Sequence, residues 1–236
     1  MDSQIYIFAD SRGKNLKINN VEVKSYPGIT LLSLLQIVCK FTEKITSSCI
    51  YIYAGINDLT TFERGYRYQE LISKSSINIP ILFEEIEKMK NNIERNNNKL
   101  IFATIPTMNI EKWNKTRLNQ GKTSHLKQIT NYKEMQNTIN NNIQEINRNI
   151  IRINTFSNYR TPYLHTTIEV NVPIKRSGTR KRYYYFKLAD GIHPTQELNN
   201  KIQERFLKAI DENTKGRTDD DTTDDSDNEP KRFWKY

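Results

Sequence analysis

Long apolar runs and clusters of cysteines are missing from this 236-residue chain. The longest early apolar run, residues 5–9, has no basic region before it and is too short for a signal peptide or a membrane span. The two cysteines, Cys39 and Cys49, lie inside apolar segments, which favours small buried side chains of a reducing compartment over a disulfide framework. We therefore expect an intracellular, cytoplasmic protein.

Internal repeats are also missing, and hydrophobic residues make up only 36% of the chain. A length of 236 residues is nevertheless enough to bury one sizeable core. We expect one folded domain over residues 1–216. Residues 217–236 contain the stretch DDDTTDDSDNE, which is too acidic and too poor in apolar residues to fold.

The net charge of +9 is unevenly distributed along the chain. Residues 219–236 carry seven acids and three bases, which leaves 33 bases and 20 acids in the rest. The basic part favours phosphates, anionic lipid head groups or acidic partners, although charge alone does not define a chemistry. The acidic tail ends in KRFWKY and is open to three interpretations: a solubilising spacer, a tether that presents aromatic residues to a protein partner, or an electrostatic cover for the basic face.

Hydrophobic periodicity predicts strands that alternate with helices. The predicted strands are 3–9, 21–26, 47–55, 99–106 and 150–156, and the predicted helices are 31–40, 79–93, 132–150 and one from residue 195. This alternation indicates an α/β fold, a three-layer α/β/α sandwich around a parallel five-stranded sheet. In such sheets the functional groups collect at the carboxyl ends of the strands.

The segments TIEVNV and RYYYFKL interrupt this alternation and predict a β-hairpin insertion with a basic turn. Residues 175–187 form a basic and aromatic ribbon, whose candidate anion-binding residues are Arg180, Lys181, Arg182 and Tyr184. Such a surface suits an anionic phospholipid or a nucleic acid. Alternatively, the tyrosines pack on the sheet and the basic turn is simply solvated.

The first candidate site is the stretch FADSRG, which places Asp10 and Ser11 at the end of the first predicted strand. A serine between a strand end and a helix start presents its hydroxyl at the rim of the sheet, where helix N-terminal amides favour negative charge. Asp and Ser are also common helix caps, so this stretch alone does not define a site.

Two further segments carry polar side chains at the ends of predicted elements. In YAGIND, Asn57 follows the third strand and can direct its side-chain NH₂ toward the rim that holds Ser11, although Asn is also a common turn residue. In LADGIHP, Asp190 precedes His193 by three residues. A carboxylate at that spacing can bind the Nδ1 hydrogen of the imidazole and leave Nε2 free to act as a base.

Together these segments meet the requirements of nucleophilic acyl transfer. Ser11 would be the nucleophile, His193 the base and Asp190 the group that orients it. The other two histidines, His125 and His165, are expected to be surface or structural residues.

The order of these segments resembles that of the SGNH, or GDSL-like, hydrolase family. The four blocks of the family correspond to FADSRG around Ser11, YPGIT around Gly28, AGIND around Asn57, and DGIHP around Asp190 and His193. The resemblance covers residues 5 to about 210.

The resemblance implies a flavodoxin-like sandwich and a serine esterase that acts through an acyl-serine intermediate. It also implies an oxyanion hole made of the backbone N–H groups of Ser11 and Gly28 and the side chain of Asn57, with no metal or organic cofactor. The family usually has Gly-Asp-Ser in its first block, whereas here Ala9 precedes Asp10 and adds a methyl group at a crowded strand end.

Two functions therefore follow from the sequence. The first is an esterase that hydrolyses an acyl ester, such as an acetyl ester. The second is an accessory protein of a virus or mobile element that binds nucleic acid or an anionic membrane through the basic ribbon, with a secondary or idle hydrolase site.

Overall fold

A central sheet of four parallel strands organises the computed structural model, which describes residues 4–65, 68–74, 77–126, 131–173 and 179–214. The strands are β1 (Ile5–Ala9), β2 (Val21–Ser25), β3 (Cys49–Tyr53) and β6 (Lys99–Phe102), in the order β2-β1-β3-β6. This order matches the first four strands of a flavodoxin-like sheet. The predicted parallel α/β fold is thus confirmed.

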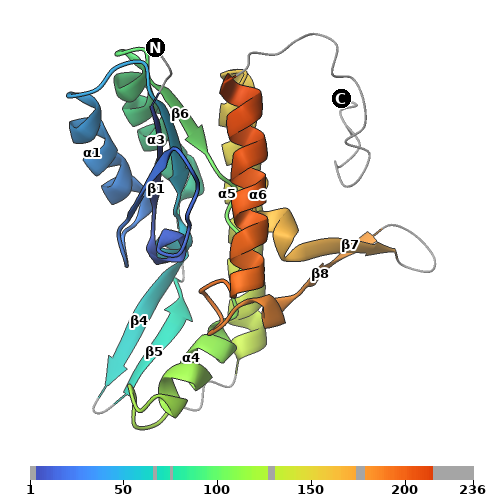
Figure 1. Ribbon diagram of the computed structural model, residues 1–236. Helices are drawn as coiled ribbons and strands as arrows, with labels where there is room; N and C mark the ends of the chain where they lie inside the picture. Colours follow the sequence, from blue (N-terminus) through green and yellow to red (C-terminus); the bar gives the residue numbers. More distant parts are fainter. Residues whose placement is uncertain (1–3, 66–67, 75–76, 127–130, 174–178, 215–236) are drawn as a thin grey trace, which may run out of the picture.

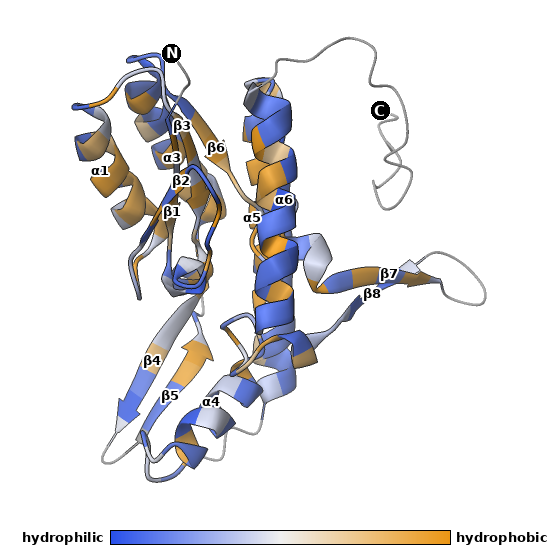
Figure 2. Ribbon diagram, in the orientation of Figure 1, coloured by the Kyte–Doolittle hydropathy of each residue, from blue (hydrophilic) through white to orange (hydrophobic). Residues whose placement is uncertain are grey.

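Helices cover both faces of the sheet, as Figure 1 shows. Helices α1 (Leu31–Thr42) and α3 (Ile79–Glu94) pack on the face that carries Phe8, and α6 (Gln196–Thr214) packs on the face that carries Tyr51. Successive strand residues alternate between the two cores because the side-chain period of a strand is two. Figure 2 shows the apolar residues concentrated on the strands and on the helix surfaces that face them.

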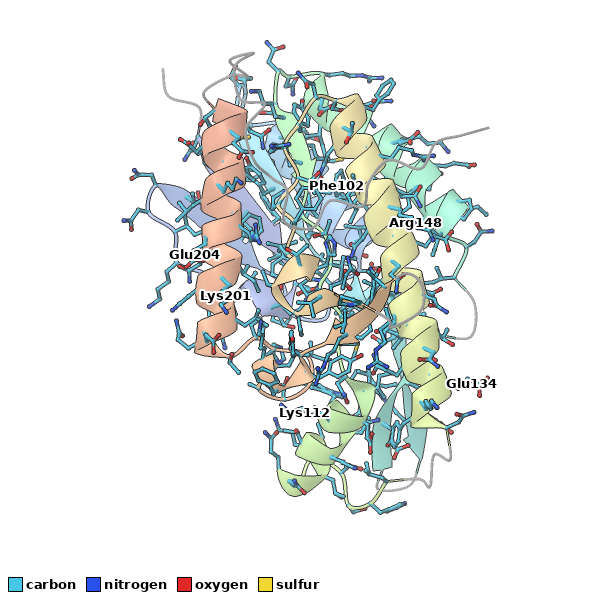
Figure 3. The ribbon with its side chains drawn as sticks, turned by 90° about the vertical axis from the view of Figure 1, so that its right-hand side faces the viewer. Phe102, Lys112, Glu134, Arg148, Lys201 and Glu204 are labelled. Carbon is cyan, nitrogen blue, oxygen red and sulfur yellow. The ribbon has the colours of Figure 1, made fainter. Side chains whose placement is uncertain are left out.

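The strand predicted at 150–156 is wrong, because these residues form the end of α5 (Tyr132–Phe156). Buried isoleucines continue at helical spacing as far as Ile153 and anchor the helix beside β6. The short apolar run IIRI fits either a strand or a buried helix turn, and the length of the preceding helix decides between them. In Figure 3, Phe102 of β6 is labelled between α6 and α5, while Arg148 lies on the exposed side of α5.

Buried asparagines of α5 bond the backbone along the edge that a fifth strand would have covered. Asn154 accepts from the backbone N–H of Phe102 at 3.1 Å and donates to its carbonyl at 2.7 Å. Asn147 does the same for Ile105, at 2.7 and 2.9 Å. These side chains satisfy backbone groups that would otherwise be unpaired.

Two antiparallel hairpins extend the sandwich. One consists of β4 (Thr60–Gly65) and β5 (Tyr68–Ser73), which were not predicted; it follows the short α2 (Ile56–Leu59) and packs against α4 (Ile110–Asn119). The other consists of β7 (Glu169–Pro173) and β8 (Thr179–Tyr183), so the predicted hairpin is present. Its second strand was placed too late in the sequence: β8 includes Thr179–Lys181 of the predicted turn, and Tyr185–Lys187 of the predicted strand form a 3₁₀ turn. Single 3₁₀ turns occupy residues 11–13, 165–167 and 185–187.

Two predicted features lie outside the described residues. They are the acidic tail, 217–236, and the tip of the basic hairpin, with Lys175 and Arg176. None of the described helices combines the length and the apolar character needed to cross a membrane.

Candidate active site

Ser11 begins a single 3₁₀ turn directly after β1, and a buried ion pair holds this turn in place. The carboxylate of Asp10 accepts hydrogen bonds from the backbone N–H and the guanidinium of Arg12, with 2.7 Å between Oδ2 and Nη2. Arg12 also lies over the ring of Tyr53, 4.8 Å from its centroid. Asp10 is therefore committed to the turn, which presents the neighbouring Ser11 at the sheet rim.

Gly13 accommodates the methyl group of Ala9. A Cβ atom placed on Gly13 would lie 2.3 Å from the Cβ of Ala9, far inside van der Waals contact. The turn therefore tolerates alanine at the strand end because glycine stands opposite it. The Ala9 methyl group, which replaces the usual glycine of the first block, therefore fits without a steric clash.

His193 lies between Ser11 and Asp190. Its Nε2 is 3.0 Å from the Oγ of Ser11, and its Nδ1 is 2.7 Å from the Oδ2 of Asp190. The other carboxylate oxygen of Asp190 accepts the backbone N–H groups of Ile192 and His193, at 3.0 and 2.8 Å. Burial acts to raise the pKa of Asp190, but the hydrogen bonds from His193 and Ile192 outweigh it and lower this pKa.

Helix α4 supports the loop that carries this histidine, a feature that sequence reasoning missed. The backbone N–H of Asn109 donates to the carbonyl of Gly191 at 2.7 Å. Gly191 has a φ of +101°, and a Cβ atom there would lie 2.4 Å from the oxygen of Asn109. The ring of Trp113 lies 5.7 Å from the ring of His193, centroid to centroid. The sequence held one sign of this support: Gly191 of DGIHP, a residue without a side chain, which allows α4 to approach the loop closely.

Of the predicted oxyanion residues, Gly28 lies on the loop after β2 and Asn57 lies in the short helix α2, which follows β3. These strands flank β1 in the sheet, so both segments border the end of β1 where Ser11 lies. Gly28 has a φ of +77°. Asn57 uses one side-chain hydrogen to bond the carbonyl of Ile29 at 2.9 Å, and the second hydrogen of the amide has no acceptor among the described residues.

Asp58, next to Asn57 in α2, also bonds the segment that follows β2. Its carboxylate accepts the backbone N–H of Leu31 at 2.9 Å, at the start of α1. Burial raises the pKa of Asp58 to about 6, although the hydrogen bond from Leu31 and the charge of Lys74 oppose this shift. Thus Asn57 and Asp58 both fasten the PGIT loop to the end of β3.

The predicted anion-binding residues lie elsewhere, on the hairpin that projects from the body in Figure 1. Arg180, Lys181 and Arg182 belong to β8 and are exposed, and Lys181 pairs with Glu169 at 3.0 Å. The ring of Tyr184 lies 5.8 Å from the guanidinium carbon of Arg182. In Figure 2 this strand is drawn mainly as hydrophilic.

The two remaining histidines differ in their surroundings. His165 is largely buried, with its Nδ1 2.8 Å from the hydroxyl of Thr104, and burial lowers its pKa to about 4. It is therefore a neutral side chain that holds the segment after β6. His125 lies on the loop after α4.

Comparison with known proteins identifies the fold. No family model matches the chain. N-acylneuraminate cytidylyltransferases of two Streptococcus agalactiae strains are 24% identical over 208 residues, which are 87% of this chain and 38% of each relative. The chain thus spans well under half of these proteins.

Solved structures of hydrolases match most of the chain. A GDSL-like lipase from Bacteroides thetaiotaomicron has a TM-score of 0.61 and 16% identity, over 88% of this chain and 87% of that one. A lipase/acylhydrolase from Enterococcus faecalis has a TM-score of 0.53 and 17% identity, over 89% and 95%. An acetyl xylan esterase has a TM-score of 0.52 and 11% identity, over 87% and 98%. At these identities the likeness shows the fold, so the resemblance to SGNH hydrolases is confirmed at that level.

Proposed function

We propose that this chain, with its SGNH hydrolase fold, is a serine esterase that cleaves acyl esters through an acyl-serine intermediate. The observation that carries the proposal is the continuous contact from Ser11 through His193 to Asp190, at 3.0 and 2.7 Å. Both distances are within the hydrogen-bond reach that activation of a serine requires. The hydroxyl, the base and the group that orients the base are therefore in contact without any rearrangement.

The first half of the reaction forms the acyl-enzyme. His193 takes the proton of the Ser11 hydroxyl as its oxygen attacks the ester carbonyl. The backbone N–H groups of Ser11 and Gly28 and the free side-chain hydrogen of Asn57 stabilise the negative oxygen of the tetrahedral adduct. The adduct collapses when His193 gives its proton to the leaving alcohol oxygen, and the acyl group stays on Ser11.

The second half repeats these steps with water. His193 removes a proton from the water as it attacks the acyl-serine, and then returns the proton to the Ser11 oxygen as the carboxylic acid leaves. The lowered pKa of Asp190 keeps this carboxylate ionised at neutral pH, so it stabilises the imidazolium that forms in each half-reaction.

The names of the matched proteins favour an acyl ester as the substrate class. They include a lipase, an acylhydrolase and an acetyl xylan esterase. We therefore propose an acetyl ester as the first substrate to test. The match to the cytidylyltransferases covers 38% of their length, so cytidylyl transfer is not part of the proposal.

Hydrolysis of p-nitrophenyl acetate and labelling with a fluorophosphonate test this function together. We expect the reagent to label Ser11, and Ser11→Ala to lose about 10⁴- to 10⁶-fold in kcat, because the nucleophile is gone. Asn57→Ala should lose about 10²- to 10³-fold, as expected for an oxyanion donor. Ser33→Ala, on the exposed side of α1, is the control and should match the wild type. Labelling of a different residue, or wild-type turnover by Ser11→Ala, would contradict the proposal.

A second function, binding of an anionic polymer, is favoured by the exposed cations of β8. Phe186, just beyond this strand, is 69% exposed, although large apolar side chains are usually covered. This function places the partner on the basic ribbon rather than at Ser11, and it is compatible with an active esterase.

A further inference from the structure

Three side chains form a row that leads away from His193 between α4 and the β4–β5 hairpin. Trp113 lies beside the histidine, with 5.7 Å between the ring centroids. The guanidinium carbon of Arg117, one helical turn further, is 5.7 Å from the Trp113 ring centroid and 6.0 Å from that of Phe62. Phe62 on β4 is 40% exposed, so the end of the row opens to solvent.

Two buried nitrogens of this row make no hydrogen bond within the described part of the chain. Among the described residues, the buried Nε1 of Trp113 and the buried Nε of Arg117 have no hydrogen-bond partner. Within the same residues no carboxylate lies within ion-pair distance of the Arg117 guanidinium, which lies over two aromatic rings. A cation held on aromatic rings without a counter-charge is ready to bind an anion.

The other cations of α4 are already engaged, which distinguishes Arg117 from them. Lys112 donates to the carbonyl of Leu188, and its position on α4 is marked in Figure 3. Lys115 pairs with Glu111 at 2.6 Å, and the Lys115 side chain is 61% exposed. Arg117 is therefore the α4 cation with neither a carboxylate nor a carbonyl partner in the described part of the chain.

The position of Trp113 relates the row to one part of the substrate. In the proposed reaction His193 donates its proton to the leaving alcohol oxygen, so the alcohol part of the ester lies on the imidazole side of the site. The acyl oxygen faces the other side, toward Gly28 and Asn57. A side chain that lies beside the imidazole therefore contacts the alcohol part.

We propose that the substrate is an acyl ester of a cyclic alcohol that carries a negative charge, a carboxylate or a phosphate. This proposal rests on the esterase function and specifies the substrate of the same site. The indole of Trp113 packs against the ring of the alcohol, and the guanidinium of Arg117 pairs with its anionic group, to which it can offer two parallel hydrogen bonds. Arg117 is thus a specificity-determining residue, separate from the residues that carry out the acyl transfer.

Three matched acetyl esters test this specificity. They are 4-acetoxybenzoate, 4-acetoxyphenyl phosphate and the neutral methyl 4-acetoxybenzoate, which share the ring and the acetyl group. The measured quantity is the ratio of kcat/KM for each anionic ester to kcat/KM for the neutral one. Both kcat/KM values of a ratio are measured on the same protein preparation. A variant that is partly unfolded therefore lowers both values equally and leaves the ratio unchanged.

We expect the wild type to prefer at least one anionic ester, and Arg117→Gln to lower that preference about tenfold or more, mainly through KM. This is the size expected for loss of one charge-assisted interaction. Arg117→Lys should keep part of the preference because it keeps the charge. The two anionic esters show whether the site selects a carboxylate or a phosphate. Lys115→Gln removes an equal charge from the same helix and should leave the ratios unchanged.

The failure of this inference differs from the failure of the esterase function. Equal ratios in the wild type and Arg117→Gln, or equal losses in Arg117→Gln and Lys115→Gln, would overturn the anionic substrate while leaving hydrolysis dependent on Ser11. Hydrolysis of the neutral ester that survives Ser11→Ala would instead overturn the esterase function itself.

Discussion

At the scale of single residues, the buried carboxylate of Asp58, near Ser11, makes the stability of the folded protein depend on pH. Its buried carboxylate binds the backbone N–H of Leu31, with Lys74 and Asp10 as the charged groups that influence it. Burial raises its pKa from 3.8 to about 6, so the folded protein binds a proton more tightly than the unfolded chain does. The stability that this proton contributes is complete below pH 4 and is lost as the pH rises through 6.

Asp58→Asn should remove this loss because the amide oxygen can still accept from Leu31 and carries no charge. We expect the variant to be more stable than the wild type by about 1 kcal/mol at pH 4.5 and by about 3 kcal/mol at pH 7.5. Urea unfolding at the two pH values measures the difference. His165 has the opposite sign, since its lowered pKa of about 4 costs stability as the pH falls below 6.5, and it contributes equally to both proteins. A variant with the same stability difference at both pH values would contradict the assignment to Asp58.

The same scale separates what the sequence could predict about the site from what it could not. Ser11, Asn57 and His193 each follow or precede a predictable element in a short recognisable string, so the contact of His193 with Ser11 and the place of Asn57 after a neighbouring strand followed from the sheet topology. Trp113 and Arg117 come from α4, which was not predicted because its contacts are long-range: its position depends on packing against β5 and Gly191. Local patterns predict residues at strand ends, but they do not predict the residues that a neighbouring helix brings to them.

At the scale of elements, α5 protects an open sheet edge with side chains instead of a strand. Asn147 and Asn154 are seven residues apart, so they lie on the same face of the helix, and they reach the backbone of Ile105, after β6, and of Phe102, within β6. Asn114 of α4 repeats the arrangement on β5, where it bonds both the N–H and the carbonyl of Leu71 at 2.8 and 2.9 Å. The prediction of a fifth strand assumed that a sheet edge needs another strand, and these contacts show the alternative.

Removal of one such amide should be costly. Asn147→Ala leaves the N–H and the carbonyl of the buried Ile105 unpaired, and each lost partner costs about 1–3 kcal/mol. We expect a total loss of about 2–6 kcal/mol in the free energy of unfolding by urea. Asn141→Ala, on the exposed side of the same helix, should change it by less than about 0.5 kcal/mol. Similar losses of unfolding free energy in the two variants would contradict this prediction, because they would mean that a change in helix propensity, and not the loss of the edge contacts, causes the destabilisation.

At the scale of the whole molecule, the basic charge is displayed on a projecting element. Arg180 and Arg182 alternate along β8 and therefore share one face, and Tyr184 continues that row beside Arg182. Lys181 points to the other face and is paired with Glu169. Arg180 and Arg182 have no ion-pair partner among the described residues, and Tyr184 follows directly after β8. We expect these groups to suit a single-stranded nucleic acid, whose phosphates and bases can bind arginines and an aromatic ring in turn.

Salt dependence of binding distinguishes this surface from general attraction by a basic protein. We expect the affinity for a single-stranded RNA oligonucleotide, measured by fluorescence anisotropy, to fall with salt concentration. The double variant Arg180→Gln/Arg182→Gln should reduce the slope of log K against log salt by about 1.4, since each phosphate contact on a single strand contributes about 0.7. Lys181→Gln should reduce it less, because this lysine is already neutralised by Glu169.

An unchanged slope in the double variant would assign RNA binding to the rest of the basic surface. Binding to anionic vesicles without binding to RNA would mean that the hairpin binds a membrane instead. Because the hairpin and Ser11 lie on different elements, we expect Ser11→Ala to leave the slope unchanged, which separates RNA binding from the proposed esterase function.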